Sequence, residues 1–216
     1  DVLVTFGLTC ANIATEAAPH LRDMPVIKAG LRNEQTLRML PHSPHTVVVT
    51  TEYDYQQQVA VFKKIKPSAK TACILYRLQH EHIREEVQAL NKALIDAGLK
   101  TYLHVLAHTT HIDNQLSAAA ISYDSLFLMP YTVTASTVQE LVTYCSAKGI
   151  TLCAQEFDIV ALGAAIGFGE SEKELGSHIG HLIRNMCEGK KHYPTGTIMT
   201  NYPVYRCQIN KRKCDV

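Results

Sequence analysis

The sequence predicts an α/β protein built from two lobes with parallel sheets. Two observations lead to this class. Short runs of β-branched and apolar residues alternate along the chain with longer segments in which apolar residues recur every three or four positions. This alternation is typical of strand–helix–strand units. The strand-like runs are also almost continuously apolar, as expected for parallel strands that are covered by helices on both faces.

The predicted strands are residues 1–6, 24–30, 45–51, 71–76, 100–106, 125–130, 150–154, 163–168, 195–200 and 204–209. Predicted helices lie between them: one beginning near residue 11, then 33–40, 53–65, 81–97, 111–120, 134–147 and 171–187. The helix over 81–97 has the clearest pattern, because Ile83, Val87, Leu90 and Leu94 form one stripe and Gly98 ends it.

The strands divide unevenly along the chain. Those from residue 71 onward are numerous enough for a complete Rossmann-like lobe, whereas only three precede them. We therefore predict an incomplete first lobe over 1–68, a second lobe over 69–190 and crossover strands over 191–216 that return toward the first lobe. The boundary falls near Pro67–Lys70.

Composition excludes several classes of function. The formal net charge is +1 and the acidic and basic residues are well mixed, so no basic patch indicates nucleic-acid binding. No apolar run reaches the roughly 20 residues of a membrane span. Residues 1–6 are too short for a signal peptide, so we expect any export signal to have been removed.

The seven cysteines contain no CxxC pair, which argues against a zinc ribbon or a redox motif. Four of them are expected to be small buried side chains: Cys73, Cys145, Cys153 and Cys187. Cys207 and Cys214 are close enough in sequence to pair in an oxidising compartment.

The candidate binding residues are those that follow the strands, because ligands of open α/β sheets bind beyond the carboxyl ends of the strands. After the strand at 1–6, Gly7 leads to Thr9, Cys10 and Ala11 at the start of a helix. Free amides and the helix dipole bind a carboxylate or phosphate there. An equally weighted alternative is that Thr9 simply caps the helix.

Other strand ends carry charged, aromatic or hydroxyl side chains: Arg32, Tyr76, Arg77, Tyr131, Thr132, Glu156 and Asp158. Taken singly, each is better explained as a solvated loop side chain. Their recurrence at several strand ends favours a site for a zwitterionic or aromatic ligand, in which acids bind an ammonium and cations or amides bind a carboxylate.

Catalytic and metal-binding motifs are weak. The chain has no GxSxG, P-loop, GxGxxG or HExxH motif. Neither His80-Glu81-His82 nor the group His104, His108 and His111 has convincing metal-ligand spacing, so we expect no metal and no cofactor. Cys10 resembles one half of a two-cysteine racemase, but its partner thiol would have to follow a strand of the other lobe, and Cys153 lies within a strand.

The order of these segments resembles the ABC-transporter substrate-binding proteins of the tryptophan/tyrosine-binding type, which have the type I periplasmic binding fold. The resemblance covers nearly the whole chain. It is carried by residues 1–14, by FKKIKPSAKTACILY (62–76), by SLFLMPYTVTAS (125–136), by GITLCAQEFDIVALGAAIGFG (149–169) and by Glu174-Leu175-Gly176 before a long helix.

The resemblance implies a periplasmic or cell-exterior protein, not an enzyme, that captures an amino-acid-like solute between two closing lobes and delivers it to a membrane permease. By position, Thr9 and the amides after it would bind a carboxylate, Tyr131 would contact the ligand, and Glu156 or Asp158 would meet an amino group.

Two departures from the family pattern leave alternatives open. Gly30-Leu31-Arg32-Asn33 stands where the family has a Thr-Asp-Pro turn, which suggests a changed ligand, or a sensor or degenerate relative without transport. The family also has strand–helix units ahead of the segment that resembles 1–14. Without them the strand at 1–6 would have a bare edge, so we expect a homodimer through it. The racemase-like enzyme remains a second alternative.

Overall fold

The computed structural model describes residues 2–6, 10, 13, 24–31, 46–50, 53–78, 81–107, 112–118, 122–130, 132–156, 158–169, 172–188, 198–201, 206–210 and 212–213. The chain divides into two compact units. Unit 1 comprises Asp1–Tyr53 and Glu170–Val204, and unit 2 comprises Asp54–Gly169 and Tyr205–Val216. The chain therefore passes between the units three times.

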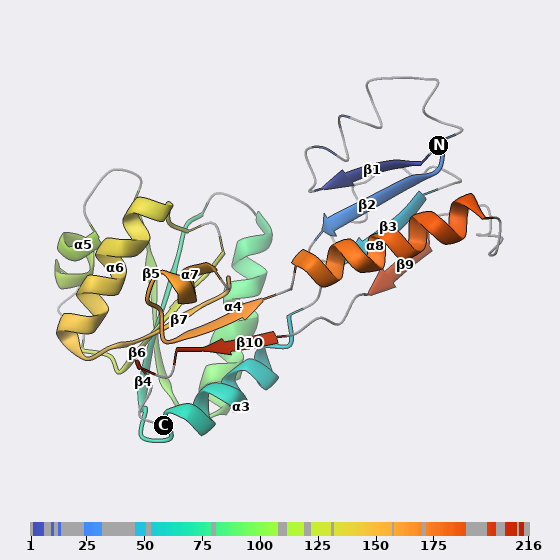
Figure 1. Ribbon diagram of the computed structural model, residues 1–216. Helices are drawn as coiled ribbons and strands as arrows, with labels where there is room; N and C mark the ends of the chain where they lie inside the picture. Colours follow the sequence, from blue (N-terminus) through green and yellow to red (C-terminus); the bar gives the residue numbers. More distant parts are fainter. Residues whose placement is uncertain are drawn as a thin grey trace. The chain divides into compact units, whose positions relative to one another are not determined.

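Unit 1 contains a parallel four-stranded sheet in the order β1 (Leu3–Phe6), β2 (Val26–Leu31), β3 (Thr46–Thr50) and β9 (Ile198–Asn201). Helix α8 (Glu172–Cys187) packs on one face, where its buried stripe meets apolar side chains of β2 and β3 (Figure 1). This core consists of Ile27, Ala29, Val47, Val49, Leu175, Ile179 and Leu182.

The side chains that alternate with this core in β2 and β3 are more polar. Lys28 is only 1% exposed, and its register partner in β1 is the buried Thr5. Burial lowers the pKa of the Lys28 ammonium, because a charge loses solvation when it leaves water.

Unit 2 contains a six-stranded sheet in the order β10-β8-β7-β6-β4-β5. Its strands are β4 (Thr71–Tyr76), β5 (Lys100–Val105), β6 (Ser125–Leu128), β7 (Thr151–Ala154), β8 (Ile166–Gly169) and β10 (Arg206–Ile209). All pairings are parallel except that of β10 with β8. Strands β6, β7 and β8 are buried at every residue, as expected of a doubly covered sheet.

Helices cover both faces of this sheet (Figure 1). On one face, α5 (Ile112–Ala118) and α6 (Ala135–Lys148) pack through Leu116 and Leu141 onto Leu75, Leu126 and neighbouring apolar residues. On the other lie α3 (Tyr55–Ile65) and α4 (Glu81–Asp96). There the ring of Phe62 meets that of Phe127 edge to face, with centroids 5.1 Å apart.

Two helix ends follow the glycine signals in the sequence. Gly149 ends α6 in the left-handed conformation, with φ 67°, and its amide donates to the carbonyls of Cys145 and Ser146. Gly98, with φ 82°, follows α4. A fifth described helix of unit 2, the short α7 (Asp158–Ala161), was not predicted, because four residues are too few to show a helical period.

The predicted fold class is confirmed, but the structure divides the chain differently from the predicted lobes. Helix α3, placed in the first lobe by the sequence, belongs to unit 2, because Phe62 packs on Phe127. Helix α8, placed in the second lobe, belongs to unit 1 through its contacts with β2 and β3. Of the two final strands, only β9 returns to unit 1.

The predicted helix over 33–40 lies outside the described residues, and of the one that begins near residue 11 only Cys10 and Ile13 are described, both of them helical. Among the described helices, none is long and apolar enough to cross a membrane.

Candidate functional site

The carboxyl ends of the parallel strands of unit 2 meet at one edge of the sheet, which we call the carboxyl edge. Backbone hydrogen bonds continue to the last residue of these strands. The amide of Leu106 donates to Tyr76 O (2.8 Å), that of Met129 to Leu75 O (3.0 Å) and that of Gln155 to Leu128 O (3.2 Å). The backbone positions of the residues that follow these strands are therefore fixed by the hydrogen bonds of the sheet.

Arg77 directly follows β4 at this edge and is half-buried. Its Nε is buried and has no hydrogen-bond partner among the described residues. A guanidinium stays charged at all ordinary pH values, and a buried donor without an acceptor costs free energy. Arg77 thus presents an unsatisfied cationic donor at the carboxyl edge.

Acidic side chains lie at the end of β7. Glu156 is half-buried and Asp158, the first residue of α7, is exposed. In the sheet, β6 lies between β4 and β7, so the strands that carry Arg77 and Glu156 are about 10 Å apart. The carboxyl edge therefore carries both signs of charge within the dimensions of a small molecule.

Two further predicted residues lie at this edge. Tyr76, the last residue of β4, is half-buried, and Thr132 is 1% exposed. The Thr132 hydroxyl donates to the carbonyl of Pro130 over 3.5 Å, a long and therefore weak hydrogen bond. Its hydroxyl retains most of its capacity to bind a further polar group.

The residue before Glu156, Gln155, belongs to a pair of buried amides. Gln58 of α3 donates through Nε2 to Gln155 Oε1 (3.1 Å), and Gln155 Nε2 donates to Gln58 Oε1 (2.7 Å). The sequence did not predict this pair. The available signal was a polar residue, Gln58, next to Val59 on the apolar face of its helix, but nothing local could link it to a residue 97 positions away.

Four predicted residues lie outside the described residues: Thr9, Ala11, Arg32 and Tyr131. Cys10 is described and exposed, and it belongs to unit 1. The structure thus brings Tyr76, Arg77, Thr132, Glu156 and Asp158 to one edge of one unit.

The cysteines differ from expectation in one case. Cys187 is exposed, and not buried as predicted, because it ends α8 beyond the apolar stripe. Cys73, Cys145 and Cys153 are buried, and burial raises the pKa of the Cys73 and Cys145 thiols to about 12. Cys207 is half-buried in β10, whereas Cys214 lies outside the described residues, so the predicted pairing of the two stays a prediction.

Within the described ranges, no group of three His, Cys, Asp or Glu side chains could hold a metal ion. Of the three histidines considered as possible ligands, His104 lies in β5, where burial lowers its pKa. His108 and His111 are outside the described residues.

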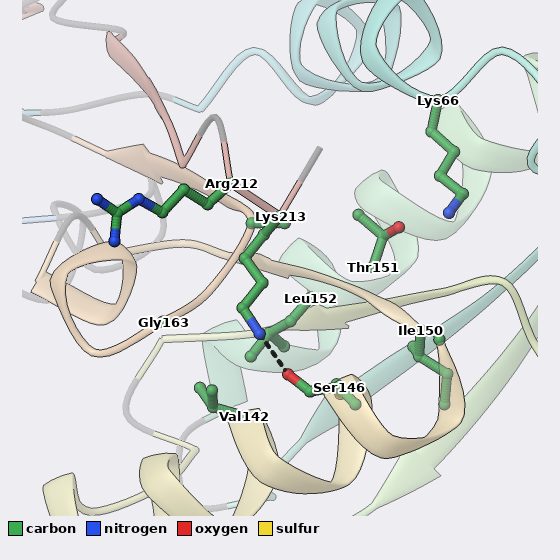
Figure 2. A pocket seen from close by; sticks show the side chains of 12 residues that line it. Lys66, Val142, Ser146, Ile150, Thr151, Leu152, Gly163, Arg212 and Lys213 are labelled. Carbon is green, nitrogen blue, oxygen red and sulfur yellow. Dashed lines mark hydrogen bonds between the residues drawn. The ribbon is translucent and has the colours of Figure 1, made fainter. Parts of the chain in front are cut away.

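A cavity of about 280 Å³ lies at the opposite, amino edge of the unit 2 sheet. Lys66, Arg212 and Lys213 line it, together with the carboxyl end of α6 and the start of β7 (Figure 2). Lys213 Nζ donates to Ser146 Oγ (2.7 Å). Cations are stabilised beside the carbonyls that end a helix, so α6 accounts for this charge without a ligand.

The sequence matches the family described as ABC transporter substrate binding protein over residues 1–211. The chain therefore belongs to this family, and it is a solute-binding component of an ABC transporter. Such proteins bind small solutes, interact with a membrane permease and typically act outside the cytoplasm. They form a binding class and not an enzyme class. No curated protein matches the sequence.

Solved structures agree with this fold. The ABC domain from Streptococcus pneumonia, in complex with L-Trp, is 20% identical with a TM-score of 0.75, covering 99% of this chain and 74% of that one. A substrate binding protein with adhesive properties from Clostridium difficile, in its ligand-free open form, is 16% identical with a TM-score of 0.78, covering 99% and 72%. A conserved domain protein from Vibrio cholerae is also 16% identical, with a TM-score of 0.73 and coverage of 99% and 72%.

Proposed function

We propose that the solute is a small amino-acid-like molecule, with aromatic amino acids as the first candidates. The observation that carries this proposal is the buried Nε of Arg77, which has no acceptor among the described residues, at the same edge as two carboxylates. A zwitterion supplies the anion that Arg77 lacks and a cation for the acids.

The residues of unit 2 take complementary roles in this proposal. Arg77 binds the carboxylate of the ligand, and Glu156 or Asp158 binds its ammonium. Tyr76 and Tyr131 offer flat aromatic surfaces, and Thr132 offers a hydroxyl. Thr9, Cys10, Ala11 and Arg32 are further proposed ligand contacts, as the family resemblance implies, with Thr9 and the amides after it as the group that binds an anion.

The L-Trp complex of the Streptococcus pneumonia protein supports the choice of ligand class, since that protein has the same fold. The substitution of Arg32 for an expected acid supports a ligand other than L-Trp, with more negative charge. L-Trp and a more negatively charged ligand of this kind both belong to the class of small zwitterions and carboxylates.

We also propose that the chain acts on the periplasmic or outer side of the membrane, after removal of an export signal, and delivers its ligand to an ABC permease.

We further propose a homodimer that forms through β1. β1 is paired with β2 and stands at the end of the described strand order, and Phe6 in it is 54% exposed. Light scattering that gives a single monomer mass would exclude the dimer.

The direct test is a thermal-shift screen of the purified protein against the common amino acids and small dicarboxylates. A ligand at one hundred times its dissociation constant stabilises the folded state by about 2.7 kcal/mol. A shift with one amino acid, lost in Arg77→Met, supports the proposal. A folded protein that no compound stabilises contradicts the amino-acid ligand and favours a sensor or degenerate relative.

The enzyme alternative predicts a different result. A racemase-like protein would interconvert the enantiomers of a bound amino acid, and alkylation of the exposed Cys10 thiol would abolish this turnover. Saturable binding without racemisation, measured by chiral chromatography, supports capture. Cys153, the thiol considered as its partner, is 1% exposed within β7 and so is poorly placed for this chemistry.

A further inference from the structure

The Gln58–Gln155 amide pair joins the first helix of unit 2 to the end of β7. Gln58 lies one turn into α3, shortly after the chain enters unit 2 at Asp54. Gln155 is the residue between β7 and Glu156. Because each amide donates to the oxygen of the other, at 3.1 and 2.7 Å, the two hydrogen bonds close a ring.

Burial makes this pair unusual. The exposed fractions of Gln58 and Gln155 are 0% and 2%, and an amide moved out of water must recover its hydrogen bonds inside the protein. Apolar side chains of similar length would pack at least as well, as Phe62 and Phe127 do in the same layer. Stability alone therefore gives no reason for two amides at this position.

The geometry of the two hydrogen bonds gives a reason for having amides at these positions. Apolar side chains can slide against each other, whereas two amides are both satisfied only in one relative arrangement. The backbone amide of Gln155 also donates to Leu128 O (3.2 Å). Gln155 is thus fixed to β6 through its backbone and to α3 through its side chain, and the next residue along the chain is Glu156.

We infer that Gln58 is a positioning residue for the solute site: through its amide pair with Gln155 it fixes Glu156 and the start of α7 at the carboxyl edge. This inference rests on the proposed function, since Glu156 and Asp158 are the acids assigned to the ligand ammonium. Gln58 itself lies in the buried layer between α3 and the sheet and acts only through Gln155.

The test uses Gln58→Met, Gln155→Met and the double variant in the full chain, because methionine matches glutamine in length and lacks its polar atoms. Each single variant leaves one buried amide unsatisfied and lowers Tm by roughly 2–10 °C. The double variant removes both amides, so its Tm returns to within about 2 °C of the parent protein.

Two readouts then separate positioning from packing. The first is amide hydrogen exchange of residues 156–161 in the ligand-free protein, and the second is calorimetric affinity for L-tryptophan. The inference predicts that the double variant, although its Tm is restored, exchanges at least roughly tenfold faster in this segment. It also predicts an L-tryptophan Kd raised by roughly tenfold or more. Parent-like exchange in the double variant would overturn it.

A matched control lies at the opposite edge of the same sheet. Asp124→Ala should lower Tm by an amount similar to that of the single glutamine variants, yet leave exchange over 156–161 at the parent rate. Equal acceleration in this control means that the effect is general destabilisation, and the inference fails. If the parent protein does not bind L-tryptophan, that ligand is lost from the proposed function, while the exchange measurement still decides the role of Gln58.

Discussion

The two edges of the unit 2 sheet are built from the same strands but differ in hydrogen bonding: a charged group at the amino edge has its hydrogen-bond partners, whereas one at the carboxyl edge lacks a partner for a buried donor. At the amino edge, the carboxylate of Asp124 accepts three hydrogen bonds, from Lys70 N (2.7 Å), Thr71 N (2.9 Å) and Thr71 Oγ1 (3.0 Å). At the carboxyl edge, Arg77 Nε is buried with no partner among the described residues. A satisfied charge contributes to stability, whereas an unsatisfied one is retained only where something else binds it.

The amino edge should therefore dominate stability. Asp124→Ala removes all three acceptor interactions and leaves the amides of Lys70 and Thr71 without their partner, so we expect a loss of about 2–4 kcal/mol in the free energy of unfolding. Urea titration of the full chain measures it. As a comparison, Asp158→Ala, an exposed acid at the other edge, should change the same quantity by less than about 0.5 kcal/mol.

Backbone strain at Gly163 should have the next largest effect. Gly163 has φ 120°, and a Cβ there would lie 2.8 Å from Val142 Cγ1. Gly163→Ala should cost about 1–3 kcal/mol in the free energy of unfolding, from strain and from the clash. Combining it with Val142→Ala relieves only the clash. A double variant no less stable than Val142→Ala would show that neither cost exists.

The contribution of Asp124 should depend on pH with a defined sign. Hydrogen bonds from Lys70 and Thr71 hold the pKa of its carboxyl below the ordinary value of 3.8. The ionised form is thus favoured by folding, and its contribution is complete above that value and is lost as pH falls through the lowered pKa. The stability difference between the parent protein and Asp124→Ala should shrink as pH falls below about 4. A difference constant with pH contradicts this assignment.

A smaller effect on stability than at Asp124 or Gly163 is expected at Arg77. Arg77→Met removes a donor that makes no hydrogen bond through Nε among the described residues, so the free energy of unfolding should change by less than about 1 kcal/mol, with a gain as the favoured sign. Ligand affinity should nevertheless be lost in the thermal-shift screen. Destabilisation as large as that of Asp124→Ala would mean that Arg77 supports the fold rather than the ligand.

Local patterns predicted the elements of this fold, and contacts between distant residues decided their assembly. The stripe of Ile83, Val87 and Leu90 identified α4 from the sequence alone. The membership of α3 in unit 2 could not be predicted, since it depends on Phe62 meeting Phe127, 65 positions later. The boundary therefore fell at the proline near residue 67 instead of at Asp54.

In the candidate site, too, some features follow from local sequence patterns and others depend on contacts between distant residues. The rule that ligands bind beyond strand ends selected Tyr76, Arg77, Thr132 and Glu156, and these lie at one edge of the sheet because the direction of parallel strands follows from the order of elements. The rule does not indicate how such an edge is supported. Gln58 and Gln155 are unremarkable in sequence, and only the packing of α3 against β7 makes them a pair.

The chain crosses between the two units three times, and this has a consequence for biosynthesis. Unit 1 takes α8 and β9 from residues 172–201, and unit 2 takes β10 from residues 206–209. The last described strand of unit 1 is therefore synthesised only at residues 198–201, and that of unit 2 only at residues 206–209. The emerging chain can form the sheet of unit 2 up to β8, but β1, β2 and β3 must wait for α8 to cover the core they share. Maturation of the two units is thus linked in time, and a chain truncated before residue 198 would lack a strand of each unit.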